Sequence, residues 1–202
     1  MATGRGALRQ YSVAVRMMLA ATVLLGIAYP LAVTGIGQLA ASAQANGSML
    51  TDESGNPVGS ALLGQSFTDA DGAPLPEWFQ SRLSAAGDGY DGTSSGGSNQ
   101  GPESEDLVAA IDERRAAIAE FEGVDPAEVP ADALTASASG LDPHISPDYA
   151  LLQVDRVAAA RGLDADAVED LVRSMIQPGD LGYLGDPTVN VLRLNLALQQ
   201  MG

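Results

Sequence analysis

The feature that most constrains this chain is a run of 35 residues without a charge, between Arg16 and Asp52. A spanning helix needs about 20 consecutive apolar residues to cross roughly 30 Å of hydrocarbon. Met17 to Ala40 meets that length. The sequence therefore predicts one transmembrane helix over residues 13–40, after a cytoplasmic N-terminus of residues 1–12.

Charge is distributed unevenly on the two sides of this run. Arg5, Arg9 and Arg16 give the N-terminal segment +3, and because the whole chain carries −16, the remainder carries −19. Short arginine-rich segments stay in the cytoplasm. The asymmetry predicts a single-pass protein of the cell membrane with a cytoplasmic N-terminus, whose residues 41–202 form one extracytoplasmic domain of ordinary size.

A secretory signal peptide is the alternative interpretation of the same run. Arg9 and Arg16 fit its basic region, and Ala41-Ser42-Ala43 fits the small-residue pattern of a cleavage site. The apolar stretch is long for a signal core, and a spanning helix tolerates Pro30 when its neighbours satisfy the freed carbonyl. The pattern favours a retained anchor, and both interpretations export the acidic domain.

Small residues give the anchor a surface that another helix can approach closely. Gly26 and Gly35 belong to it, and Tyr29-Pro30 predicts a kink with a freed backbone carbonyl. We expect Gly26, Tyr29, Pro30 and Gly35 to take part in helix packing. The alternative stays open, because membrane helices are in general richer in glycine and proline than soluble ones.

Composition excludes several kinds of chemistry for the exported part. The chain has no cysteine, so neither a disulfide nor a thiolate is possible. His144 is its one histidine, which excludes a site with two histidine ligands and a relay of two imidazoles. Nothing resembles a nucleophile elbow. We therefore expect no catalytic residue, no metal site and, at a pI near 4.1, no nucleic-acid partner.

Local signals predict an α+β domain that is mainly helical. A short β-hairpin is expected from Met49–Leu50 and Val58–Leu63, around a turn of residues 52–57. The glycine- and serine-rich segment 84–101 reads as a linker. The expected helices each have a cap or a stop signal: residues 105–122 after Ser104, one helix from Pro147 to Gly162 after Ser146, the helix after Asp164, and a C-terminal helix after Asn190.

The C-terminal segment is ambiguous, because its leucines at 192, 194, 196 and 198 also alternate as in a strand. The Asn190 cap favours the helix.

Two runs are candidate sites. Ser95, Gly96, Gly97, Ser98 and Asn99 could surround an anion with backbone N–H groups, but the run lacks the Gly-Lys-Ser/Thr ending of a phosphate-binding loop. Asp142, His144 and Ser146 belong to a proline-bounded run that is typical of a rigid turn followed by a helix cap. The same run is a candidate contact with a partner.

Several of these runs together resemble the C subunit of the Kdp potassium-transporting ATPase. Their order and spacing match that family, from Ala28-Tyr29-Pro30-Leu31 to Leu198. The runs that carry the resemblance are Gln44-Ala45-Asn46-Gly47-Ser48, Gly59-Ser60, Gly64-Gln65, Ser95-Gly96-Gly97-Ser98-Asn99, Thr135-Ala136-Ser137, Ser139-Gly140-Leu141-Asp142-Pro143-His144-Ile145-Ser146-Pro147, Leu184-Gly185-Asp186-Pro187 and Val189-Asn190-Val191-Leu192. The chain departs from the family near Arg82, where an Arg-Pro-Ser is usual, and at Ala138 and Gln100.

The resemblance implies an accessory subunit without catalysis of its own. Its partners would be a channel-like A subunit and a P-type B subunit, with a small F subunit as a further candidate. The family is regarded as stabilising that assembly and raising the ATP affinity of the B subunit. Ser95 to Asn99 would be the nucleotide contact, yet an exported loop cannot reach cytoplasmic ATP, so we expect an indirect effect.

ATP and potassium would then be handled by the complex, with no cofactor held firmly by this chain. An acidic exported domain could also raise the local potassium concentration, within the reach that salt screening allows. The alternative function, from a different class, is a freestanding membrane-anchored binding domain that works without a pump.

Overall fold

The computed structural model describes residues 3–202, with side chains from Gly6 onward. Met1 and Ala2, at the start of the predicted cytoplasmic segment, and the side chain of Arg5 lie outside the described residues. The chain divides into two compact units, one up to Met49 and the other from Leu50 to Gly202.

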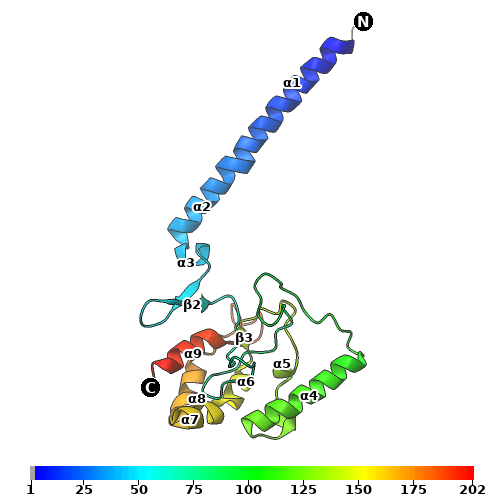
Figure 1. Cartoon of the computed structure of the whole chain (residues 1–202). Helices are drawn as coiled ribbons and strands as arrows, with labels where there is room; N and C mark the ends of the chain where they lie inside the picture. Colours follow the sequence, from blue (N-terminus) through cyan, green and yellow to red (C-terminus); the bar gives the residue numbers. More distant parts are fainter. Residues whose placement is uncertain (1–2) are drawn as a thin grey trace. The chain divides into compact units, whose positions relative to one another are not determined.

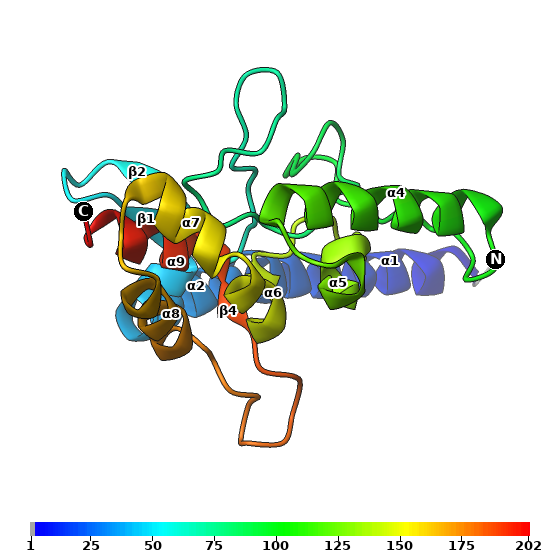
Figure 2. The same cartoon turned by 90° about the horizontal axis from the view of Figure 1, so that it is seen from below.

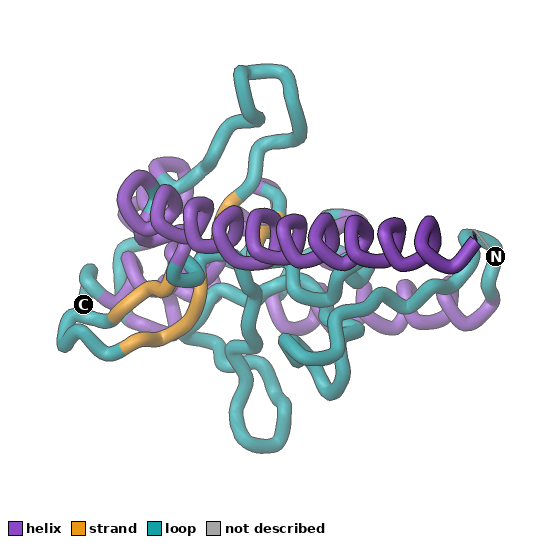
Figure 3. Tube along the Cα trace, turned by 90° about the horizontal axis from the view of Figure 1, so that it is seen from above, coloured by secondary structure: helices purple, strands orange, loops and turns teal. Residues whose placement is uncertain are grey.

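The first unit is one long helical rod, drawn without interruption in Figure 3. It consists of α1 (Thr3–Ala21), the π-helix η1 (Thr22–Ala28) and α2 (Tyr29–Ala40). Gly6 to Ala40 is long and apolar enough to cross a membrane, and none of its residues is buried within the chain. The one predicted spanning helix is confirmed by length and composition.

Proline is accommodated in this rod by a wider turn and not by a kink. Pro30 has no N–H, and its ring would meet the carbonyl four residues earlier. In η1 the hydrogen bonds reach one residue further, so that the Tyr29 N–H donates to the carbonyl of Leu24. Figure 1 shows no sharp bend where α2 begins, so the kink expected from Tyr29-Pro30 is absent.

The first unit ends in a short helical turn. After Ala41 the chain forms α3 (Ser42–Ala45). The amides of Gln38 and Asn46 exchange two hydrogen bonds of 3.2 and 3.0 Å, and Asn46 also donates to the Ser42 carbonyl at 2.6 Å. These bonds hold the end of α2 against the segment that follows it.

The predicted hairpin opens the second unit. It pairs β1 (Met49–Thr51) with β2 (Pro57–Ser60), so its second strand ends at Ser60 and not at Leu63. Asp52 forms the turn, since its Oδ1 accepts the N–H groups of Ser54 and Asn56 at 2.9 and 2.8 Å.

Helix α4 (Glu105–Glu122) has the predicted bounds and ends at Gly123 in a left-handed conformation. Ser104 occupies the N-cap position, but its side chain makes no bond into the helix, so the predicted serine cap is wrong in this detail. The 3-10 helix η2 (Pro126–Glu128) and α5 (Ala131–Leu134) follow. Figure 2 shows α4 and α5 on one side of the unit.

The helix expected from Pro147 to Gly162 is divided into α6 (Pro147–Leu152) and α7 (Val154–Arg161). Gln153 lies between them and is fully buried. Its Oε1 accepts the Gln80 N–H at 2.6 Å, and its Nε2 donates to the carbonyls of Gln80 and Tyr149, each at 3.2 Å. Bonds to a segment 73 residues away thus accompany the division, and no local signal announced them.

The C-terminal part combines a small ladder with the expected helices. Asp164 caps α8 (Ala165–Ser174). β3 (His144–Ile145) pairs antiparallel with β4 (Val189–Asn190), with His144 opposite Asn190. Asn190 then caps α9 (Val191–Gln199), so the helical interpretation of the ambiguous leucines is confirmed.

The core lies where the extended segment before residue 80 meets α7, α8 and α9. Phe79 supplies its largest fully buried side chain, and the Asn195 side chain accepts its N–H and donates to its carbonyl, both at 2.9 Å. The other large fully buried apolar residues come from the three helices and β4: Val157, Val168, Val172, Val189, Val191, Leu194 and Leu198. The fold is therefore mainly helical α+β, as predicted.

Candidate functional site in the loop cluster around Asp142

Three loops meet around Asp142. We call this assembly the loop cluster; it consists of Arg82–Ser84 with Tyr90, of Ser95–Gly97, and of Ser137–His144 from a distant part of the sequence. Two of these segments, Ser95–Gly97 and Ser137–His144, contain runs that carry the family resemblance, and the structure brings the two candidate runs of the sequence into one region.

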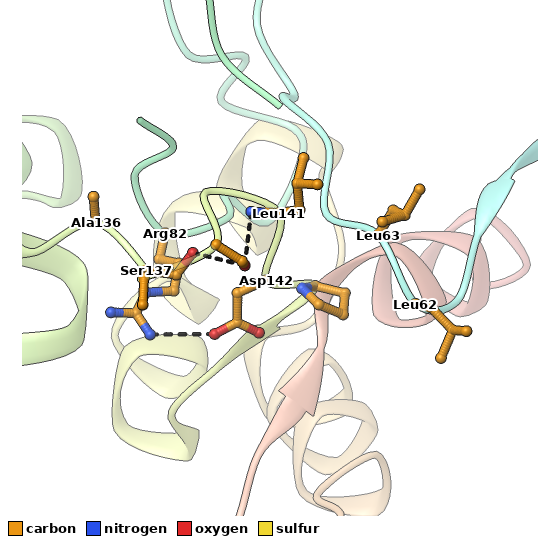
Figure 4. Close-up of a pocket in the computed structure, with 10 residues that line it drawn as sticks. Leu62, Leu63, Arg82, Ala136, Ser137, Leu141 and Asp142 are labelled. Carbon is orange, nitrogen blue, oxygen red and sulfur yellow. Dashed lines mark hydrogen bonds and ion pairs between the residues drawn. The ribbon is translucent and has the colours of Figure 1, made fainter. Parts of the chain in front are cut away.

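Arg82 and Asp142 form the ion pair at its centre. Nη1 of Arg82 lies 3.2 Å from Oδ2 of Asp142, as Figure 4 shows, and Nη2 donates to the Thr135 carbonyl at 3.2 Å. Oδ1 of Asp142 accepts the His144 N–H at 3.0 Å and lies 3.5 Å from its Nδ1. Among the described residues, buried Nε of Arg82 has no hydrogen-bond partner.

Asp142 stays ionised in this arrangement. Burial alone raises the pKa of its carboxyl, but the hydrogen bonds from His144 and the charge of Arg82 outweigh burial, and the pKa lies below its ordinary value. Tyr90 donates its hydroxyl to the Arg82 carbonyl. Burial raises the pKa of Tyr90 to about 12, so that this donor keeps its proton at neutral pH.

Ser84 and Gly140 join the first loop to the third. Ser84 Oγ donates to the Gly140 carbonyl at 2.6 Å and accepts the N–H groups of Ala86 and Tyr90. Gly140 has φ +67°, and a Cβ there would lie 2.7 Å from Cβ of Ala86 and from the Gly96 carbonyl oxygen. Only glycine fits this position, because any side chain would combine strain with overlap.

The Ser95 to Asn99 run is tethered to the same loop. The Ser139 carbonyl accepts both the Ser95 hydroxyl and the Gly96 N–H at 2.9 Å. Gly97 lies against Ala138, whose carbonyl oxygen would be 3.1 Å from an added Cβ. Ser98 and Asn99 are exposed, and Asn99 has φ +53°. One N–H of the supposed anion-binding run is therefore already used within the domain.

The second candidate run, Asp142, His144 and Ser146, is divided between two roles. Asp142 and His144 belong to the loop cluster, and the His144 side chain is one-third exposed. Ser146 is instead bound by Asp132, which accepts its N–H and its hydroxyl at 2.8 Å each, while Ser146 Oγ caps α6 by accepting the Tyr149 N–H. The structural interpretation of Ser146 thus has a direct physical basis.

A shallow cavity of about 610 Å³ opens beside the ion pair (Figure 4). Leu62 and Leu63, from the connection after β2, line it together with Leu141 and Pro143, and polar residues line it as well. The polar lining consists of Arg82, Ser137, Ser139 and Asp142. The cavity thus has an apolar wall beside a charged pair.

Sequence reasoning did not single out Arg82, Ser84 or Tyr90. One signal was present for Arg82, which is the one basic residue between Arg16 and Arg114 in an acidic chain. The roles of Ser84 and Tyr90 depend on partners 56 and 8 residues away, and no spacing rule predicts them.

In the anchor, Gly35 has no atom within 4 Å of an added Cβ, Gly26 meets only Thr22 of its own helix, and Tyr29 is exposed. These residues are accessible on the surface of the helix. No group of three or more His, Asp or Glu side chains that could hold a metal ion occurs within the part of the chain that the structure describes.

Comparison with known proteins gives matches over almost the whole chain. The family model described as "K+-transporting ATPase, c chain" matches residues 11–200. A Kineococcus radiotolerans protein named Potassium-transporting ATPase KdpC subunit is 54% identical over 192 residues, which cover 95% of this chain and 94% of that protein. Proteins of the same name from Caulobacter vibrioides and Mycobacterium tuberculosis are 52% and 49% identical, covering 88% and 96% of this chain and 86% and 99% of their own length.

Proposed function

This chain belongs to the KdpC family of potassium-transporting ATPase subunits, and we propose that it is the accessory, non-catalytic subunit that stabilises the assembled pump. Membership in the family and the one helix of spanning length among the described residues support a single-pass membrane subunit of that complex. In the proposal, its partners are a channel-like A subunit and a P-type B subunit, and a small F subunit is a further candidate.

The orientation that we propose follows from charge. Three arginines precede the apolar helix, and the residues after it carry −19 (−16 for the chain, less +3). Positive flanks are retained in the cytoplasm, which leaves the acidic domain, residues 41–202, on the outer face. This asymmetry about one helix is the observation that carries the topology.

An effect on ATP affinity is proposed to be indirect. ATP is cytoplasmic, whereas the Ser95 to Asn99 run is in the exported domain. The Ser139 carbonyl also accepts the Gly96 N–H, so the run lacks a full set of free donors for phosphate. We propose that the loop cluster contacts another pump subunit and that the influence on ATP passes through that contact or through the anchor helix.

The test of assembly is purification in mild detergent from potassium-starved cells that express this chain with a C-terminal tag. We expect a P-type ATPase and a channel-like protein to co-purify, with ATP hydrolysis that potassium stimulates. Recovery of the chain alone, well folded and without ATPase activity, would favour the freestanding binding domain.

The test of the indirect effect uses the full-length chain in detergent and a fluorescent ATP analogue. We expect no saturable binding to the isolated chain. Tight binding that is lost in a Ser95→Ala, Asn99→Ala variant would overturn the indirect effect, because those side chains would then touch the nucleotide.

A further inference from the structure

The connection between α8 and β4 is an ordered projection, which we call the finger (Gln177–Thr188). Figure 2 shows it, in orange, standing away from the neighbouring helices. Its base is closed by two bonds between Gln177 and Thr188, of 2.8 and 2.9 Å. Two further bonds, of 2.8 and 2.9 Å, join Asp180 to Leu184. The tip therefore has a defined conformation.

The tip presents large apolar side chains to solvent. Leu181 is 82% exposed, Tyr183 75% and Leu184 52%. A single exposed leucine is ordinary on a protein surface, but here three large apolar side chains are exposed within four residues, and we call these three the patch. Exposed apolar patches mark interaction sites. Tyrosine is also enriched among the residues that dominate binding energies.

The backbone of the tip is strained at Leu181, next to the other exposed apolar side chains. Leu181 has φ +55°, in the left-handed region that leucine rarely adopts. Gly182, within the patch, and Gly185, directly after it, have φ +82° and +80°, and Gly179 has no room for a Cβ because of the Gly185 carbonyl. Strain that a fold retains is a mark of functional positions.

Charge indicates what the tip binds. Asp180 and Asp186 flank the patch and are exposed, and no basic residue occurs between Arg173 and Arg193. An anionic membrane surface would repel this segment, since interfacial segments use lysine and arginine to hold such surfaces. A second copy would bring two equally acidic domains together. The complementary partner is a protein surface with an apolar hollow bordered by basic side chains.

We propose that the finger docks into such a hollow on the extracytoplasmic side of another subunit of the potassium pump, with Leu181, Tyr183 and Leu184 as its anchors. The proposal rests on the proposed function, which supplies the complex and the outward orientation. It assigns a docking role to the Leu184-Gly185-Asp186-Pro187 run, which has no part in the loop cluster.

The first test is photo-crosslinking in native membranes. Tyr183 is replaced by p-benzoylphenylalanine, which keeps an aromatic side chain, and the adduct is identified by mass spectrometry. Val108 on α4, exposed but outside the finger, receives the same replacement as a control. We expect an adduct between position 183 and another pump subunit, and none of comparable yield from position 108. An adduct with lipid or with a second copy of this chain, or no adduct from position 183, would overturn the proposal.

The second test compares the stability of the complex. A Leu181→Asn, Tyr183→Ser variant removes two anchors, and asparagine tolerates the left-handed backbone of position 181. We expect this variant to dissociate from the purified complex at least about tenfold faster than wild type, while Val108→Ser dissociates at the wild-type rate. Equal rates for all three would contradict the docking role.

The two proposals fail in different ways. If the wild-type chain does not co-purify with pump subunits, the proposed function fails. If the wild type co-purifies and the finger variant is retained equally well, the docking role alone fails.

Discussion

At the scale of single residues, Arg156 organises the acidic domain. Its side chain is 7% exposed, and its Nε donates to Glu122, 1% exposed, at 2.8 Å. The guanidinium also lies 4.5 Å from the ring centroid of Phe121. Its remaining hydrogen bonds go to the carbonyls of Pro76 and Trp78 and to the Gln153 side chain. The Arg156 guanidinium thus joins its own helix, α7, to α4 and to the extended segment that contains Pro76 and Trp78.

We expect Arg156→Met to destabilise the protein by about 3–5 kcal/mol, because it leaves the Glu122 carboxylate buried without its partner. Arg115→Met is the matched control, since the Arg115 side chain is 41% exposed and its 3.5 Å pair with Asp112 contributes less than about 1 kcal/mol. Urea unfolding of the full-length chain in detergent, followed by the fluorescence of Trp78, measures both. Equal effects of the two substitutions would contradict the role of Arg156.

The same pair predicts a dependence on pH. Burial raises the pKa of Glu122, and the hydrogen bond and charge of Arg156 offset this only in part. The Glu122 carboxyl therefore binds a proton more readily in the folded protein than in the unfolded chain. Protonation of Glu122 thus stabilises the folded protein as the pH falls from the folded pKa towards the lower, unfolded pKa. In Arg156→Met the pKa rises further, and we expect the loss of stability to be smaller at about pH 5 than at pH 7. A loss that is the same at both would contradict this account.

At the scale of elements, α8 and α9 begin in the same way in different surroundings. Asp164 and Asn190 each accept the N–H of the third helical residue, at 3.1 Å in both cases. Asp164 is exposed, whereas Asn190 is buried and also donates to the Ala61 carbonyl at 2.9 Å. The second cap thus connects α9 to the segment after β2.

We expect Asp164→Ala to cost about 1 kcal/mol, the usual value of a cap. Asn190→Ala should cost about 2–4 kcal/mol, because it also leaves the buried Ala61 carbonyl without a donor. Asn190→Asp keeps the capping oxygen but loses that donor, and it should remain clearly destabilised. Urea unfolding compares the three, and a wild-type stability for Asn190→Asp would show that the bond to Ala61 contributes nothing.

At the scale of the whole molecule, the dominant property is negative charge. Glu113, Glu120 and Asp170 are exposed on helices and have no side-chain partner among the described residues. They can be replaced by Gln or Asn with little effect on the fold. Such replacements therefore change the charge of the domain without changing its structure.

We expect the triple replacement to raise the apparent potassium constant of the assembled pump by up to about twofold at low salt, because fewer cations accumulate near the domain. Near physiological salt the change should almost vanish, since the screening length falls from about 30 Å to about 8 Å. Arg115→Gln, which makes the domain more acidic, should act in the opposite direction. Potassium-stimulated ATP hydrolysis at two ionic strengths measures this, and no change at low salt would contradict it.

Local signals in the sequence were sufficient for much of the fold. The bounds of α4, the Asp164 and Asn190 caps, the hairpin turn at Asp52 and the single spanning helix all depend on residues within a few positions of one another. A helix cap or a turn depends on hydrogen bonds between residues close in the sequence, and insertion of a helix into a membrane depends on its apolar composition. Both can therefore be predicted from the sequence.

The tertiary structure decided what depends on distant partners. Gln80 lies 73 residues from Gln153, which separates α6 from α7, and Arg82 lies 60 residues from Asp142. The segment 84–101 reads as a linker, yet Ser84, Ser95 and Gly96 attach it to Ser139 and Gly140. The sequence by itself thus determined the long apolar helix, the charge, and the helices α4, α8 and α9. Only the tertiary structure decided which loops meet. Burial pairs hydrogen-bond donors and acceptors that lie far apart in the sequence, and no local pattern predicts such pairs.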